Sequence, residues 1–87
     1  MSMDRQALKT TALDVLRLIA PEVEPGDIVP STPLRHQVDL DSMDWLNFLI
    51  GLHQRLGVNI PEADYARLIT LDNVLDYLQG KLASAGS

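Results

Sequence analysis

The sequence predicts an all-α protein: a small four-helix bundle of three main helices and one short helix, with a long loop between the first two. Apolar residues recur at the helical period in three separate stretches. The five prolines stand between these stretches and not within them. No two segments alternate like paired strands. Since 87 residues suffice for one small domain, we expect a single domain over 1–87, with a core at about 4–82 and a disordered tail at 83–87.

The first expected helix begins at Asp4, a favourable N-cap, and ends before Pro21. Its apolar stripe consists of Leu8, Ala12, Val15, Leu16 and Ile19. Residues 21–41 then form a long connection, which its prolines keep from being one regular helix. We expect this connection to pack against the bundle because it carries five apolar residues: Ile28, Val29, Leu34, Val38 and Leu40.

The second expected helix runs over about 42–56, and Gly57 is suited to close it. A short third helix is expected over 62–68. Thr70 is a suitable N-cap for the last helix. The apolar residues of that helix are Leu71, Val74, Leu75, Leu78 and Leu82.

The second helix is apolar on two nearly opposite sides. One side is expected to face the core and consists of Trp45, Phe48, Leu49, Leu52 and Leu56. The other side carries the stripe Met43, Leu46 and Ile50, flanked by Asn47, His53 and Gln54. Two interpretations of this stripe remain open: the long loop covers it, or it is an exposed surface that docks a partner protein.

Composition excludes several classes of partner. The net charge is −5, and seven Lys and Arg spread over the chain make no basic stripe, so we expect no nucleic-acid partner. An acidic surface suits basic protein partners or serves solubility. The chain has no cysteine, no apolar run long enough to span a bilayer and no secretory signal at its start. We therefore expect a cytoplasmic monomer without membrane insertion.

Ser42 stands at the expected start of the second helix, directly after Asp41. Free backbone N–H groups and the helix dipole stabilise an anion there, so a phosphate ester on this hydroxyl is well placed. The simpler interpretation is that Ser42 or Asp41 is an N-cap. No nucleophile elbow or oxyanion-hole motif predicts an enzyme. No metal is expected, because the aspartates lack the glycine and glutamate of an EF-hand and His36 and His53 lack partners at ligand spacing.

The segment from Val38 to Asp44, with Asp41-Ser42-Met43 at its centre, resembles the D-S-L motif of acyl carrier proteins and related peptidyl carrier domains. Met43 stands where leucine is usual. The order of elements fits this family too: an amphipathic helix, a proline-containing loop, a serine-headed helix, a short helix and a last helix. The resemblance covers about residues 4–82.

The resemblance implies that a phosphopantetheinyl transferase attaches 4′-phosphopantetheine from coenzyme A to Ser42, and that Asp41 helps to engage this transferase. The thiol of the arm would then hold an acyl group as a thioester. The protein, a carrier and not an enzyme, would present it to enzymes of fatty-acid, lipid or secondary-metabolite synthesis. The implied partners are the transferase, an acyl-loading ligase or synthase, and downstream acyl-processing enzymes.

Two alternatives stay open: an aminoacyl, peptidyl or polyketide carrier, and an unmodified helical protein-interaction module. The second helix differs from the family's strongly acidic one, because Asp44 is its only acid after Ser42. This difference indicates a specialised, non-housekeeping carrier. We expect its partners to bind an apolar surface of Met43, Leu46, Asn47 and Ile50. Two interpretations stay open for a group of apolar residues, which either line a cavity for an acyl chain or fill the core: Leu16, Phe48, Leu49, Leu52 and Leu78. We expect a core that is solid at rest.

Overall fold

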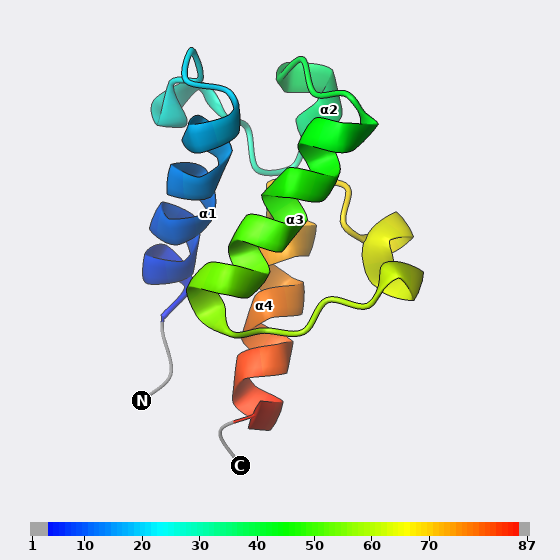
Figure 1. Ribbon diagram of the computed structural model, residues 1–87. Coiled ribbons are helices and arrows are strands. Elements are labelled where there is room, and N and C mark those ends of the chain that lie inside the picture. Colours follow the sequence, from blue (N-terminus) through cyan, green and yellow to red (C-terminus); the bar gives the residue numbers. More distant parts are fainter. Residues whose placement is uncertain (1–3, 86–87) are drawn as a thin grey trace.

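The computed structural model describes residues 4–85 and confirms an all-α fold with three long helices (Figure 1). The elements follow in the order α1 (Arg5–Ile19), 3₁₀ helix η1 (Pro25–Asp27), α2 (Leu34–Gln37), α3 (Ser42–Leu56), 3₁₀ helix η2 (Glu62–Arg67) and α4 (Leu71–Ala85). No strand forms within residues 4–85, where Pro33 and Thr70 make an isolated bridge. None of the helices in this range is long and apolar enough to cross a membrane.

Local sequence signals determine where the long helices begin and end. The Asp4 carboxylate accepts a hydrogen bond of 2.7 Å from the N–H of Ala7. Gly57 closes α3 in the left-handed conformation, with a φ of 67° that glycine adopts without steric strain. At the start of α4, the Thr70 hydroxyl accepts from the N–H of Asn73, whose side chain accepts from the N–H of Thr70, both at 3.0 Å. All three predicted ends are confirmed.

The core lies between the three long helices, with α1 packed against both α3 and α4. Figure 1 shows α3 crossing in front of α4, with α1 alongside. The five residues expected to fill the core expose 1% or less of their surface: Leu16, Phe48, Leu49, Leu52 and Leu78. They belong to one contiguous cluster of buried apolar side chains. Burial of this kind is what a solid core and the lining of an internal apolar cavity both require.

Helices α1 and α3 approach each other closely at Gly51. A Cβ atom added to Gly51 would lie 2.6 Å from Cγ1 of Val15, which is well inside van der Waals contact. Val15 is itself buried. The absence of a side chain at Gly51 therefore allows the two helices to pack at this distance.

The connection between α1 and α3 is more regular than predicted, because it contains η1 and α2. The Gln37 side chain holds it together by accepting from the Val29 N–H at 2.7 Å and donating to the carbonyls of Val29 and Thr32 at 2.8 Å each. Leu34 anchors it, fully buried, and donates its N–H to the Ile69 carbonyl at 3.0 Å. The prediction that this connection packs against the bundle is confirmed, because Ile28, Leu34, Val38 and Leu40 are buried; Val29 is the exception. The Val29 backbone is hydrogen-bonded to the Gln37 side chain, but half of the surface of Val29 is exposed.

Two other boundaries differ from the predictions. The short helix expected over 62–68 is the 3₁₀ helix η2, which ends at Arg67. Helix α4 continues to Ala85. The disordered tail predicted for 83–87 is therefore wrong over 83–85, because alanine at 83 and 85 favours helix. Residues 86–87 lie outside the described residues.

Candidate functional site

Ser42 is the first residue of α3, and it is exposed. The preceding residue, Asp41, is the N-cap: its carboxylate accepts from the Asp44 N–H at 2.8 Å, and the Asp44 carboxylate accepts from the Asp41 N–H at 3.5 Å. This capping box answers the question that the sequence left open, because Asp41 and not Ser42 caps the helix. The Ser42 hydroxyl makes no hydrogen bond to any other described residue, so it is free to react.

The start of α3 still offers hydrogen-bond donors to an anion. The N–H of Asp44 is taken by the Asp41 carboxylate, and the N–H of Trp45 donates to the Asp41 carbonyl at 3.0 Å. Within the described part of the chain, the N–H groups of Ser42 and Met43 have no acceptor. Together with the helix dipole, these two donors favour a negative group beside the serine. A phosphate ester on Ser42 therefore fits this end of the helix.

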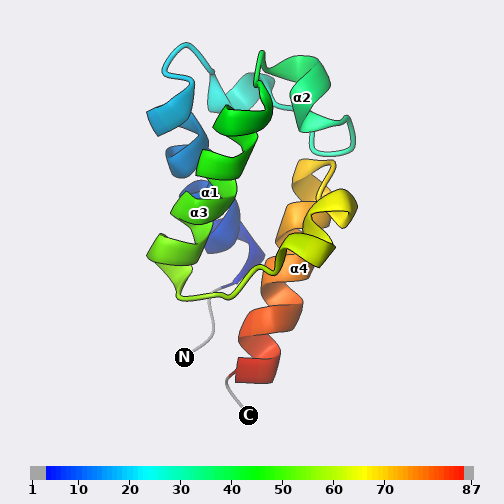
Figure 2. The same cartoon turned by 45° about the vertical axis from the view of Figure 1, so that its right-hand side comes forward.

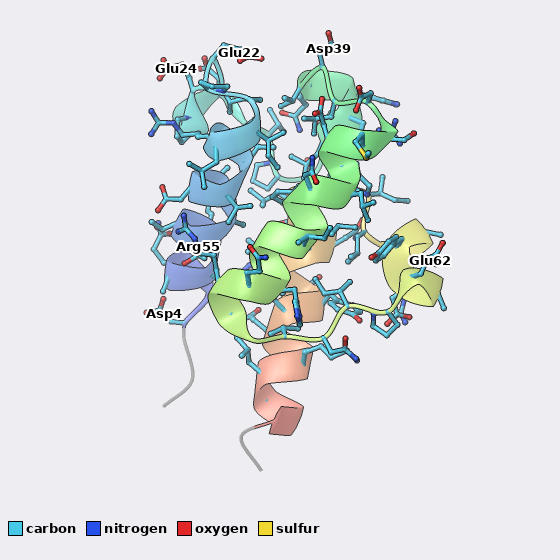
Figure 3. The ribbon with its side chains drawn as sticks, viewed as in Figure 1. Asp4, Glu22, Glu24, Asp39, Arg55 and Glu62 are labelled. Atoms are coloured by element: carbon cyan, nitrogen blue, oxygen red, sulfur yellow. The ribbon has the colours of Figure 1, made fainter. Side chains whose placement is uncertain are left out.

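Several carboxylates lie at the same end of the molecule as Ser42. Figure 3 shows Glu22, Glu24 and Asp39 near the end at which α3 begins, whereas Arg55 lies toward its other end. The capping box adds two more carboxylates beside Ser42. Like charges repel one another and attract cations, so a phosphate at Ser42 gains from any nearby positive group.

The predicted docking stripe lies on an uncovered side of α3. Met43, Leu46 and Ile50 expose 65%, 36% and 41% of their surfaces, and Asn47 beside them is exposed. The connection folds elsewhere, so the interpretation that the long loop covers this stripe is wrong. Three exposed apolar residues at helical spacing form a continuous surface next to Ser42.

A groove that the sequence did not predict lies on another side of α3, against the first turn of the helix. It has a volume of about 510 Å³ and is open to solvent. Its walls come from α2, η2 and the start of α3, and Figure 2 shows α2 and η2 on the same side of α3. The lining residues are Pro33, Arg35, His36, Leu40, Trp45, Tyr65, Ala66, Leu68 and Ile69. Because three distant segments form it, no local sequence pattern reveals it.

Trp45 joins this groove to the core. Its ring lies 5.3 Å from the ring of Phe48, tilted by 33°, and it exposes only 9% of its surface. The prediction that Trp45 is a core aromatic is confirmed, although one edge of it lines the groove.

The two histidines lie apart, and neither contacts Ser42. His36 is on α2 and lines the groove, whereas His53 is in the last turn of α3, where its Nδ1 lies 2.8 Å from the Val58 carbonyl. That distance makes Nδ1 the protonated nitrogen, because a carbonyl only accepts. Across residues 4–85, no three His, Cys, Asp or Glu side chains come together as a metal site would require.

Comparison with known proteins matches residues 6–78 to the family described as the phosphopantetheine attachment site. The chain belongs to this family. It is 31% identical over 62 residues to an acyl carrier protein of Thermosynechococcus vestitus, an alignment that covers 71% of this chain and 76% of that one. It is 32% identical over 57 residues to the meromycolate extension acyl carrier protein of Mycobacterium leprae, covering 66% of this chain but only half of that longer relative.

The fold agrees with this membership. The solved structure of the acyl carrier protein from Enterococcus faecalis superposes with a TM-score of 0.70, covering 91% of this chain and 99% of the other at 18% identity. Family membership confirms the predicted class of function. The protein is an acyl carrier that uses 4′-phosphopantetheine and acts with a transferase and acyl-processing enzymes, and it is not itself an enzyme.

Proposed function

We propose that Ser42 is the attachment residue and that Asp41 helps the phosphopantetheinyl transferase to bind. The observation that supports this most is the exposed, unbonded Ser42 hydroxyl at the start of α3, inside the matched residues 6–78. Asp41 presents its carboxylate directly before the serine. Ser42 is free of the capping role, so transfer to its oxygen leaves the helix cap intact.

The arm, when bound, supplies a thiol that holds an acyl group as a thioester. This chain has no cysteine of its own, so it contributes no competing thiol. What its residues do is position the attachment point at a rigid helix end and present it to partners. We propose fatty-acid, lipid or secondary-metabolite intermediates as the cargo, with aminoacyl and polyketide intermediates as the alternative.

We further propose that partner enzymes dock on Met43, Leu46, Asn47 and Ile50. This surface lies on the same helix as Ser42 and is mainly apolar, and Asp44 is the only acid on α3 after the serine. Apolar contact therefore contributes more of the affinity than charge pairing. The partners are the transferase, an acyl-loading ligase or synthase, and downstream acyl-processing enzymes of a specialised pathway.

Mass measurement tests the attachment residue. The protein is incubated with coenzyme A and a broad-specificity transferase, and its mass is expected to rise by one phosphopantetheine. Ser42→Ala should abolish this gain. Ser31→Ala is the matched control, because Ser31 is exposed in the connection but does not begin a long helix. A gain that survives in Ser42→Ala, or no gain with several active transferases, contradicts the proposal.

A further inference from the structure

Among the described residues, Arg35 is a cation without an acidic partner, although Asp41 and Asp44 lie a few residues further along the chain. It is exposed on α2, and its Nε donates to the Leu40 carbonyl at 3.3 Å. The ion pairs of the described residues involve Arg5 and Arg67 but not Arg35. Its two terminal nitrogens are therefore available to an anion, and Arg35 is one of the residues that line the groove.

The groove reaches the first turn of α3, although Ser42 itself does not line it. Leu40, two residues before Ser42, and Trp45, three residues after it, both line the groove. The hydrogen bond from Arg35 to Leu40 thus holds the guanidinium close to the start of α3. The rest of the lining is mixed: apolar side chains such as Leu68 and Ile69 alternate with the polar groups of His36 and Tyr65, which suits a chain of amides and methylenes. A volume of about 510 Å³ lies within the range of small-molecule sites.

We infer that Arg35 binds the phosphodiester of the arm on Ser42 and that the pantetheine part rests in this groove. The inference depends on the proposed attachment to Ser42. A guanidinium matches the geometry of phosphate oxygens and offers two parallel donors to them. It also offsets the repulsion that Asp41 and Asp44 exert on a phosphate. The occupant is tethered close to the groove, which raises its effective concentration there.

This resting position keeps the arm away from the docking surface. Trp45 and Leu46 are neighbours in sequence but face different sides of α3, one toward the groove and the other toward solvent. An arm held along Trp45 therefore leaves Met43, Leu46 and Ile50 accessible. A partner can dock first and then withdraw the arm from the groove.

Trp45, the only tryptophan of the chain, reports on the groove. Emission and its quenching by acrylamide, a neutral quencher, are compared between the protein before and after loading, with loading verified by mass. In the wild type, loading is expected to shift the emission and to protect Trp45. In loaded Arg35→Gln, loss of one partly exposed charge pair is expected to lower the ratio of docked to free arm about threefold. The chemical shift of the phosphodiester ³¹P should also differ between loaded wild type and loaded Arg35→Gln.

Arg55→Gln is the matched control, because it removes an exposed arginine from the other end of α3 and should behave like the wild type. Arg35→Lys retains the charge and is expected to recover part of the protection. If Arg35→Gln lowers the thermal midpoint, Arg35→Lys serves as the test variant in its place, with partial protection of Trp45 as the expected result. If Trp45 in loaded Arg35→Gln is protected from acrylamide as well as in the wild type, Arg35 does not bind the phosphodiester. If loading leaves the emission and quenching of Trp45 in the wild type unchanged, the pantetheine does not rest in the groove. Absence of loading itself would instead contradict the attachment at Ser42.

Discussion

The two apolar sides of α3 have similar residues and opposite environments. Phe48, Leu49 and Leu52 expose 1% or less of their surfaces, whereas Met43, Leu46 and Ile50 expose between 36% and 65%. Hydrophobicity alone does not distinguish the two, because each carries large apolar side chains at helical spacing. The difference comes from the neighbours: α1 and the rest of the core cluster cover one side, and the connection leaves the other open. One side therefore stabilises the fold, and the other remains available for binding.

The largest expected effect is on stability at the buried side. Phe48→Ala should lower the free energy of unfolding by about 3–5 kcal/mol, because it removes a fully buried ring and leaves a cavity. Leu46→Ala, on the exposed side, should change it by about 0.5 kcal/mol or less. Urea unfolding measures both. If Phe48→Ala does not fold, Phe48→Leu provides a milder comparison. Equal losses at the two positions would refute the distinction.

The close approach of α1 and α3 gives a second test on the covered side. Gly51→Ala should destabilise the protein by about 1–3 kcal/mol, since the new Cβ overlaps with Val15. Gly80→Ala is the matched control: it lies within α4 with nothing within 4 Å of its added Cβ. It should stabilise the protein by about 0.5–1 kcal/mol, because alanine favours helix.

Thermal or urea unfolding of both glycine variants decides the point. Val15→Ala combined with Gly51→Ala should recover part of the loss attributed to the overlap. A Gly51→Ala variant as stable as the wild type would show that the two helices do not pack this closely.

On the open side, the expected effect is on binding. Leu46→Ala should reduce kcat/KM for phosphopantetheine transfer about five- to tenfold, which corresponds to about 1–1.4 kcal/mol of lost docking energy. Arg55→Ala, an exposed residue in the last turn of α3, should have little effect. The affinity for partners should also depend only weakly on salt. A steep salt dependence with no effect of Leu46→Ala would assign docking to charge.

The smallest effect concerns η2, which forms one wall of the groove. The Tyr77 hydroxyl on α4 donates to the Asp64 carboxylate on η2 at 2.6 Å. Tyr77→Phe removes this bond and should cost about 1 kcal/mol. Hydrogen exchange should increase over residues 62–67 and remain unchanged in α1. An unchanged exchange rate in η2 would mean that packing alone holds it.

The same pair predicts a dependence on pH. Burial, together with the hydrogen bond to Asp64, raises the pKa of Tyr77 to about 12. An unfolded tyrosine titrates near 10, so the folded state holds this proton more tightly. The stabilisation is complete below about pH 10 and is lost as the pH rises toward 12. Tyr77→Phe should show a smaller loss of stability across this interval when unfolding is followed by circular dichroism.

The sequence predicted the helix ends and the core stripes because these depend on nearby residues. The cap at Asp4, the left-handed Gly57 and the hydrogen-bonded pair at the start of α4 all act within about one turn. It missed α2 and the exposed side chain of Val29, because Gln37 organises that loop through bonds to residues five and eight positions away. The candidate Ser42 came from its motif. The choice of Asp41 as the cap needed the geometry of both carboxylates.

By itself, the sequence determined the fold class, the order of the long helices and the serine at the head of the second one, since periodicity and capping are local properties. Only the tertiary structure decided that the second apolar side of α3 stays uncovered and where the groove forms. Those outcomes depend on how distant segments pack: α1 against Gly51, and α2 and η2 around Trp45. A helical period shows that a side is apolar, but burial requires a neighbour to cover it.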